Sequence, residues 1–223
     1  LKKKHKYIDI QEMKTENFSK TKIKICGLRR REDILAVNEA NPDYCGFIVE
    51  FPKSFRSVTA DEVRELVKNL SPEIQPVGVF VNASMELVRS LLDDETLAMA
   101  QLHGQENESY IAELKAHTDK PVIKAFSIKT ADDMENALQS PADYILLDQG
   151  SGGTGKTFDW SLIPKIERPF FLAGGIGEEN LEQAIREIHP FAVDLSSSVE
   201  TEKWKDPEKI RRVVDIVRKA VQD

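Results

Sequence analysis

Short apolar runs alternate with longer amphipathic stretches along the chain from Lys22 onward. The runs are rich in Val, Ile and Phe, and most end in Gly, Asn, Asp or Ser, as buried strands do where the chain turns away from a sheet. Eight runs have this character: TKIKICGL, DYCGFIVE, QPVGVFVN, LAMAQLHG, KPVIKAFSI, ADYILLD, RPFFLAGG and FAVDLSSS. The pattern therefore predicts eight strands.

The amphipathic stretches predict the helices. Their apolar residues recur three and four positions apart, and several stretches begin with a Ser, Thr, Asp or Asn that can cap a helix. The predicted helices are RREDILAVNEAN, TADEVRELVKNL, SMELVRSLLDD, NESYIAELKAH, TADDMENALQS, EENLEQAIREI and DPEKIRRVVDIVRKAV. The connection after ADYILLD is the exception, because its glycines and Pro164 allow a short helix at most.

Repeated strand–helix units imply parallel strands joined by right-handed crossovers. Eight units match a closed (β/α)8 TIM barrel better than an open doubly wound sheet, which is the alternative. No long linker or low-complexity break interrupts the pattern, so we expect a single α/β domain, a barrel over residues 21–223. Residues 1–20 are basic and polar without a sustained period, and we interpret them as an N-terminal extension or an arm left by expression.

Composition narrows the class of protein. The 223 residues, 40% hydrophobic and 31% charged, are enough for one sizeable core. A net charge of -7 argues against a nucleic-acid-binding surface, which needs clustered Lys and Arg. Nothing approaches the roughly 20 continuous apolar residues of a membrane-spanning helix, so we expect no membrane contact and a cytoplasmic protein. In that reducing compartment Cys26 and Cys45 are expected to be free thiols.

The chemistry of a (β/α)8 barrel sits at the C-terminal ends of its strands, so the residues there are the candidates. The first strand ends in KICG, where alternation points Lys24 and Cys26 into the barrel and Ile23 and Ile25 toward the helices. A cationic neighbour favours the thiolate form of a cysteine. We therefore interpret Cys26 as a functional thiol; the alternative is a small core residue.

Two carboxylates also lie at strand ends. The sixth strand ends in ILLD, which leaves Asp148 at the rim, on the same side as Tyr144 and Leu146. A carboxyl group there can serve as a proton donor, or it can cap the following loop. The eighth strand contains Asp194, which either orients a polar group of a substrate or pairs with Lys24.

Polar residues follow the second and fourth strands. Arg56 in SFR can hold a carboxylate through two parallel hydrogen bonds, or it is a solvated loop charge. QLHG places Gln101 and His103 on one face of a strand, and we assign His103 no catalytic role. No Cys/His spacing resembles a zinc site, so we expect no metal.

The loops after the last three strands predict a phosphate site. Glycines and small polar residues let backbone amides approach phosphate oxygens, and (β/α)8 barrels often bind phosphate after strands seven and eight. The candidate phosphate-binding residues are Gly153, Gly155, Gly174, Gly175, Ser196, Ser197 and Ser198.

One of these loops, GSGGTGKTF at 150–158, also fits a nucleotide-binding P-loop, with Lys156 and Thr157 in the expected places. A P-loop leads straight into a helix whose N-terminal amides face the phosphates, and Pro164 leaves little room for one. We therefore assign the loop to the same phosphorylated ligand as its neighbours, and a P-loop nucleotide-binding protein is the alternative.

One motif accompanies each predicted strand, and in chain order they read KICGL, GFIVEFPKSFR, VGVFVN, QLHG, ILLD, GGTGKTFDW, LAGGI and DLSSSVE. This ordered set resembles the phosphoribosylanthranilate isomerase family, (β/α)8 enzymes of tryptophan biosynthesis, from about Lys22 to the C-terminus. The resemblance implies an Amadori rearrangement of N-(5-phosphoribosyl)anthranilate, a small phosphosugar, which needs neither a redox cofactor nor a metal. It implies that Asp148 is the acid and Cys26 the base. It also implies that Arg56 binds the anthranilate carboxylate and that Asp194 lies near the substrate amine.

The chain departs from the family pattern in the last loop. Ser198 stands where the family usually has glycine, which matters if the position needs a positive φ or a close approach to phosphate. The segment TEKWKD lacks the family's Pro-Gly turn. A barrel that binds phosphoribosyl compounds without turnover is an alternative function. A second aminoaldose substrate, from histidine biosynthesis, is disfavoured by the single Arg56. The oligomeric state is expected to be a monomer or a homodimer.

Overall fold

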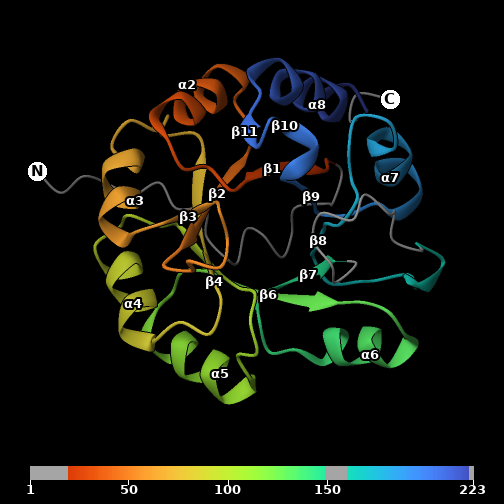
Figure 1. Cartoon of the computed structure of the whole chain (residues 1–223). Helices are drawn as coiled ribbons and strands as arrows, with labels where there is room; N and C mark the ends of the chain where they lie inside the picture. Colours follow the sequence, from red (N-terminus) through yellow and green to blue (C-terminus); the bar gives the residue numbers. More distant parts are fainter. Residues whose placement is uncertain (1–19, 149–159, 221–223) are drawn as a thin grey trace, which may run out of the picture.

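The computed structural model describes residues 20–148 and 160–220, and its core is a closed barrel of eight parallel strands (Figure 1). The barrel strands are β1 (Lys22–Cys26), β2 (Tyr44–Val49), β4 (Gln75–Phe80), β5 (Met99–Leu102), β6 (Val122–Ser127), β7 (Tyr144–Asp148), β8 (Phe170–Leu172) and β9 (Ala192–Leu195). The sheet closes because β1 pairs with β2 on one side and with β9 on the other. The eight predicted strands and the TIM barrel are confirmed, and the open doubly wound sheet is wrong.

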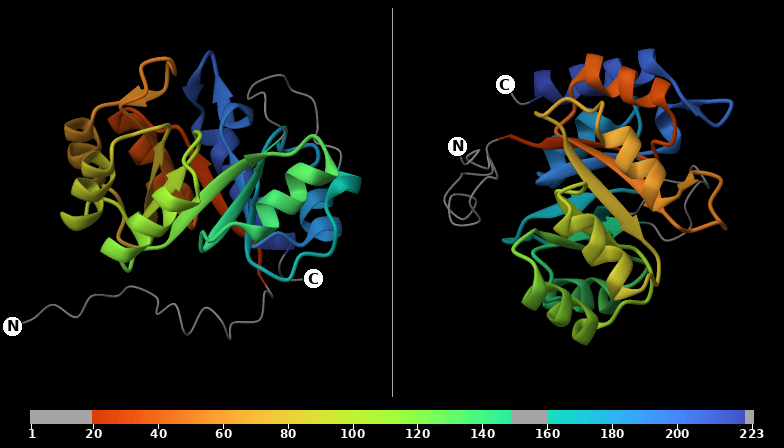
Figure 2. Two further views of the ribbon diagram at one scale, coloured as in Figure 1. Left: turned by 90° about the horizontal axis from the view of Figure 1, so that it is seen from below. Right: turned by 90° about the vertical axis from the view of Figure 1, so that its left-hand side faces the viewer.

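Helices cover the outside of the barrel (Figures 1 and 2). They are α2 (Arg31–Ala40), α3 (Ala60–Val67), α4 (Met85–Asp93), α5 (Glu108–His117), α6 (Ala131–Gln139), α7 (Leu181–Ile188) and α8 (Pro207–Ala220). Each predicted helix is present, and several begin as their caps suggest: the Thr59 hydroxyl accepts from the backbone N–H of Glu62 in a capping box. After β7 the first described element is η1 (Trp160–Leu162), a single short 3-10 turn, as Pro164 led us to expect.

Alternating side chains separate two apolar layers. Ile23 and Ile25 belong to the layer between strands and helices, as the alternation predicted. A second cluster fills the barrel interior, and in it the rings of Tyr44 and Tyr144 each meet Phe171 edge to face at 5.6 Å between centroids. Both tyrosines are the first residues of their strands, so the aromatic rings fill the N-terminal end of the barrel. The C-terminal end is left to polar side chains.

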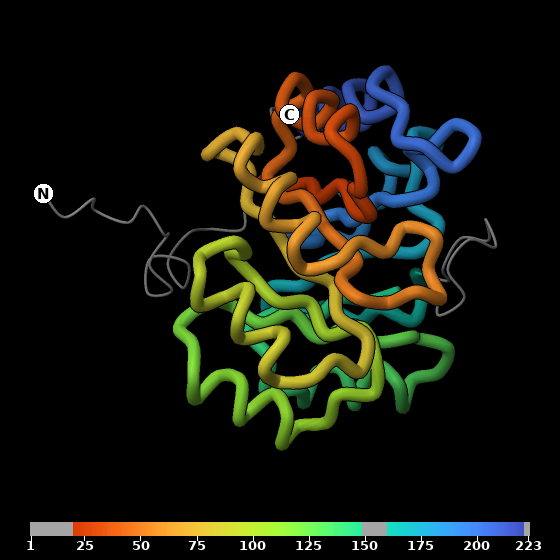
Figure 3. Tube along the Cα trace, turned by 60° about the vertical axis from the view of Figure 1, so that its left-hand side comes forward, coloured from red at the N-terminus to blue at the C-terminus, as the bar shows by residue number. Residues whose placement is uncertain are grey.

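The sequence pattern missed three very short strands near the barrel mouth. β3 (Ser57–Val58) extends the sheet beside β2, and β10 (Glu200–Thr201) with β11 (Trp204–Lys205) forms an antiparallel hairpin. The loop before β3 and this hairpin project from the same end of the barrel (Figures 2 and 3). The hairpin turns at Glu202 and Lys203, both with positive φ, so it replaces the Pro-Gly turn that the sequence lacks.

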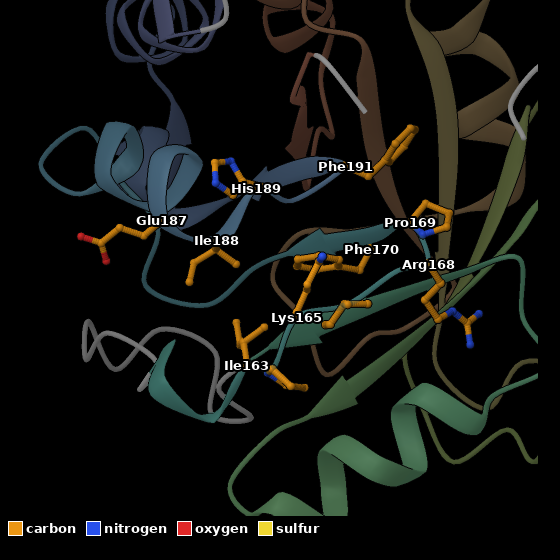
Figure 4. A pocket seen from close by; sticks show the side chains of 11 residues that line it. Ile163, Lys165, Arg168, Pro169, Phe170, Glu187, Ile188, His189 and Phe191 are labelled. Carbon is orange, nitrogen blue, oxygen red and sulfur yellow. The ribbon is translucent and has the colours of Figure 1, made fainter. Parts of the chain in front are cut away.

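A cavity of roughly 400 Å³ opens at the other end of the barrel (Figure 4). It lies beside Phe170, the first residue of β8, and Phe191, which directly precedes β9. Both residues mark the N-terminal ends of strands, so this cavity is separate from the mouth where the candidate residues lie. No helix in the described part of the chain is long and apolar enough to cross a membrane.

Candidate active site

A buried ion pair lies in the barrel interior below the mouth. Lys24 and Asp194 are register partners on the adjacent strands β1 and β9, and the Lys24 Nζ lies 2.9 and 3.0 Å from the two carboxylate oxygens of Asp194. The lysine side chain is fully buried. Burial by itself would lower the pKa of Lys24, but the charges of Asp194 and Cys26 and their hydrogen bonds with the lysine together outweigh it, and the pKa is raised. The lysine is therefore held as a cation.

The Cys26 thiol points into the barrel beside this pair, as predicted, and both Cys26 and Cys45 are free. Gly46 faces Cys26 across the β1–β2 ladder, and a Cβ on it would lie 2.8 Å from the Cys26 Sγ and 3.0 Å from the Lys24 Nζ. The glycine makes the space that both groups occupy. Burial raises the pKa of the Cys26 thiol, and Lys24 only partly offsets it. The expected thiolate is therefore disfavoured at rest, because dehydration outweighs the cation.

Asp148 ends β7 at the mouth, with 19% of its side chain exposed. Its Oδ2 lies 3.8 Å from the Nε2 of His103, which directly follows β5. The Nδ1 of His103 is 2.9 Å from the Nε2 of Gln101. The charges of His103 and Asp148 both act on the pKa of Asp194, so the three groups belong to one site. Sequence reasoning gave His103 no role, although its position after a strand end was a usable signal.

Arg56 is placed by residues from two other loops. Its Nε and Nη2 donate to the two carboxylate oxygens of Glu200, each at 2.7 Å, and the Nζ of Lys205 donates to Glu200 Oε1 at 2.9 Å. Gly27, with φ of 85°, lets the arginine side chain cross the end of β1, since a Cβ there would lie 2.5 Å from Arg56 Cδ. Sequence reasoning missed Glu200 and Lys205, and only the position of Glu200 at the end of the SSSVE motif pointed to it.

An exposed cluster of aromatic and cationic side chains joins the loops at the rim. The Arg29 guanidinium lies 3.7 Å from the Trp204 ring centroid and donates to the backbone oxygens of Phe55 and Lys203, both at 3.0 Å. The Arg56 guanidinium lies 4.2 Å from the Phe55 ring. Arg29 therefore ties the loops after β1, β2 and β9 together around the arginine of the site.

The predicted phosphate loops after β8 and β9 lie side by side. Gly174 and Gly175 adopt φ of 80° and 70°, which explains the need for glycine there. A Cβ on Gly177 would lie 3.2 Å from the Ser198 Cβ, so the two loops touch. Ser198 lies in η2 (Ser197–Val199) and its φ is not positive, so serine causes no backbone strain at that position.

Of the remaining candidate phosphate-binding residues, Ser196 is described by the structure, and Gly153 and Gly155 are not. The Ser196 hydroxyl donates to the Cys26 backbone oxygen at 3.0 Å, which joins the last loop to the first strand. Gly153 and Gly155 lie outside the described residues, as does the whole P-loop-like segment 150–158.

Replacing Glu200 by Gln is expected to lower stability in a pH-dependent way. Burial acts to raise the pKa of the Glu200 carboxyl, but Arg56 and Lys205 outweigh it and hold the pKa below its ordinary value. A lowered pKa contributes stability above the ordinary carboxyl range, and the contribution is lost as pH falls through the lowered value. The stability difference between wild type and Glu200→Gln should therefore shrink from neutral pH to below about 4.

Urea unfolding over this pH range measures the difference. Glu65→Gln is the matched control, because Glu65 pairs with Lys68 on an exposed helix face and should show little effect at any pH. A pH-independent loss in Glu200→Gln would show that Glu200 is not ionised against Arg56.

Comparison with known proteins agrees with this arrangement. The family model for N-(5′-phosphoribosyl)anthranilate isomerase matches residues 23–216. An isomerase of that name from Endomicrobium trichonymphae is 44% identical over 201 residues, covering 88% of this chain and 98% of the relative. The crystal structure of phosphoribosyl anthranilate isomerase from Thermotoga maritima is 36% identical, with a TM-score of 0.80 over 89% of this chain and 99% of that one.

A further solved isomerase binds reduced 1-(o-carboxyphenylamino)-1-deoxyribulose 5-phosphate; it is 32% identical, with a TM-score of 0.75, and covers 89% of this chain and 99% of its own. The family model, the relatives and the solved barrels all match isomerases over most of the chain. They exclude the alternative that the chain is a P-loop nucleotide-binding protein. The chain belongs to the N-(5′-phosphoribosyl)anthranilate isomerase family, the isomerases of tryptophan biosynthesis.

Proposed function

We propose that Asp148 is the general acid and Cys26 the general base of the Amadori rearrangement of N-(5-phosphoribosyl)anthranilate to 1-(2-carboxyphenylamino)-1-deoxyribulose 5-phosphate. One observation carries this assignment. The two groups end β7 and β1, which are separated in the barrel by β8 and β9, so they face the mouth from different sides. A sugar between them would have a proton donor on one side and a proton acceptor on the other.

The chemistry proceeds in two proton transfers. The Asp148 carboxyl protonates the ring oxygen of the furanose, the bond from that oxygen to C1 breaks, and the nitrogen lone pair forms an iminium with C1. The Cys26 thiolate then takes the proton from C2, and the released electron pair forms a C1–C2 double bond while the iminium π electrons return to nitrogen. Tautomerisation of this enolamine gives the aminoketose.

The raised pKa of Cys26 fits this order of events. Before ring opening the thiol is protonated, because burial disfavours the charged form. The iminium then places a positive charge close to the sulfur, and Lys24 supplies another, so the thiol releases its proton to water at the barrel mouth and the thiolate that remains takes the C2 proton. The base is thus activated by the intermediate on which it acts.

Arg56 is proposed to bind the anthranilate carboxylate. Its Nε and Nη2 are occupied by Glu200, which leaves Nη1 without a hydrogen-bond partner in the described part of the chain. The phosphate is proposed to bind the loops with Gly174, Gly175 and Ser196–Ser198, together with Gly153 and Gly155. Asp194 is proposed to lie below the substrate amine while it remains paired with Lys24.

The described site draws on loops of a single chain, so the proposal holds for a monomer or a homodimer. We place the protein in the cytoplasm, since two free cysteines suit a reducing compartment.

Turnover of freshly prepared N-(5-phosphoribosyl)anthranilate tests the function. The fluorescence of the anthranilate group should decay rapidly with catalytic amounts of protein. A folded protein that binds the reduced product analogue without turnover would instead support the non-catalytic binding barrel.

A further inference from the structure

Gln101 and His103 form a polar pair next to the proposed acid, in which Gln101 is buried and 37% of the His103 side chain is exposed. They stand two residues apart at the C-terminal end of β5, on the face that points into the barrel. Gln101 is only 1% exposed, and its Nε2 lies 2.9 Å from His103 Nδ1. The Gln101 Oε1 is buried and accepts no hydrogen bond within the described ranges. A buried amide oxygen without a partner is costly, so we infer a role beyond packing for this pair.

The amide determines which imidazole nitrogen carries the proton. When Gln101 Nε2 donates to Nδ1, the proton of a neutral ring must sit on Nε2. The reverse amide orientation would pair Oε1 with an Nδ1–H and leave the whole NH2 group buried without a partner. The reverse orientation thus leaves two N–H groups without a partner within the described ranges, whereas the present one leaves one N–H and Oε1. Buried unpaired N–H groups are tolerated less well than unpaired carbonyl oxygens, so the reverse orientation is disfavoured. His103 therefore presents an N–H toward Asp148 Oδ2, at 3.8 Å between nitrogen and oxygen.

The surroundings keep the ring neutral. Although 37% of the side chain is exposed, partial desolvation lowers the pKa of His103, and together with nearby lysines it outweighs the opposing effects of Asp148 and Asp194. The other charges that the ring faces are Lys24 on β1, Asp194 on β9 and Lys124 on β6, and the two lysines also disfavour the imidazolium. A neutral ring donates from Nε2 at neutral pH without competing with Asp148 for the proton.

We propose that His103, with its tautomer set by Gln101, is a positioning residue that keeps the transferable proton of Asp148 on Oδ1. An N–H that faces Oδ2 would clash with a proton on that oxygen, so the acid carries its proton on the other one. After proton transfer to the sugar, the same N–H stabilises the carboxylate. The separation of 3.8 Å is longer than a hydrogen bond, and we expect it to shorten in the substrate complex, as catalytic contacts often do. The inference rests on the proposed role of Asp148.

The tautomer is measured on the wild-type protein by 15N NMR of the histidine rings. The chain has four histidines, and a His103→Gln spectrum assigns the relevant signals. We expect an unprotonated Nδ1 and a protonated Nε2 at neutral pH. In Gln101→Glu the new carboxylate accepts from Nδ1, so the ring should change to the Nδ1–H tautomer or to the imidazolium. A wild-type ring with its proton on Nδ1 would overturn the proposal.

Kinetics test the consequence for the acid. His103→Gln and Gln101→Glu should lower kcat by at least about tenfold and change KM by less than about twofold, because they disturb proton transfer and not binding. The acidic and alkaline limits of the kcat–pH profile should also shift. His117→Gln on the exposed face of α5 is the matched control and should retain the wild-type profile. Unchanged kcat and pH profile in both test variants would overturn the proposal.

A double-mutant cycle separates this inference from the proposed function. In an Asp148→Asn background, His103→Gln should not lower kcat any further, because the carboxyl group that His103 positions is absent. If Asp148→Asn alone keeps full activity, the assigned acid is wrong. If Asp148→Asn is inactive while the His103 and Gln101 variants behave as wild type, the acid stands and the positioning role fails.

Discussion

Cys26→Ala and Asp148→Asn should each lower kcat by roughly 10²- to 10⁴-fold, the contribution of a well-placed base or acid. Alanine removes the sulfur that takes the C2 proton. Asparagine keeps the shape of the carboxyl group but has no proton acidic enough to open the furanose ring. Both substitutions leave Arg56 and the phosphate loops in place, so affinity for the reduced product analogue should change little. Fluorescence decay of the substrate measures kcat, and titration with the analogue measures binding.

Cys45→Ala is the matched control for the thiol. Cys45 pairs in register with Ile25, the residue before Cys26, and it belongs to the apolar layer under the helices. Its loss should affect stability slightly and turnover hardly at all. Wild-type turnover in Cys26→Ala would show that another group is the base.

Lys24→Met should destabilise the fold by about 3–5 kcal/mol, since it leaves the Asp194 carboxylate buried without its cation. The side chain of Asp194 is only 8% exposed, so water cannot replace the lost partner. Lys24→Met combined with Asp194→Leu should recover most of this loss, because the barrel interior then holds two apolar side chains in place of the ion pair. Urea unfolding monitored by circular dichroism gives the free energies of unfolding.

Lys68→Met provides the comparison for this prediction. Lys68 pairs with Glu65 on the surface, where both side chains are mostly exposed, and its replacement should leave stability essentially unchanged. If Lys24→Met unfolds at the same urea concentration as the wild type, Lys24 and Asp194 are not an ionised pair in the native state.

The sequence by itself determined the eight strands, the seven long helices and the sides to which many residues point. These features depend on local periodicity. Successive side chains of a strand point to opposite faces, and residues three or four positions apart in a helix lie on the same face. Cys26 and Asp148 could be selected for the same reason: each occupies an inward position at the end of a strand. The family resemblance then supplied the substrate, which no pattern of apolar residues contains.

Only the tertiary structure decided which side chains meet. Arg56 and Glu200 are 144 positions apart, and Lys24 and Asp194 are 170 apart; both contacts exist because the barrel closes between β1 and β9. The relation of His103 to Asp148 likewise depends on the order of β5, β6 and β7 around the barrel.

The protonation of the Cys26 thiol also depends partly on the local sequence and partly on the tertiary structure. The sequence predicts a lysine beside the thiol, and the structure contains it. The charge of Lys24 is nevertheless not enough to lower the pKa of the thiol. Burial of the sulfur in the closed barrel raises the pKa of the thiol more than Lys24 lowers it. Alternation along β1 predicts that Lys24 lies beside Cys26. The amount of water around these two side chains depends on all eight strands and on the loops above them. Dehydration is a property of the whole fold, so no local pattern could predict it.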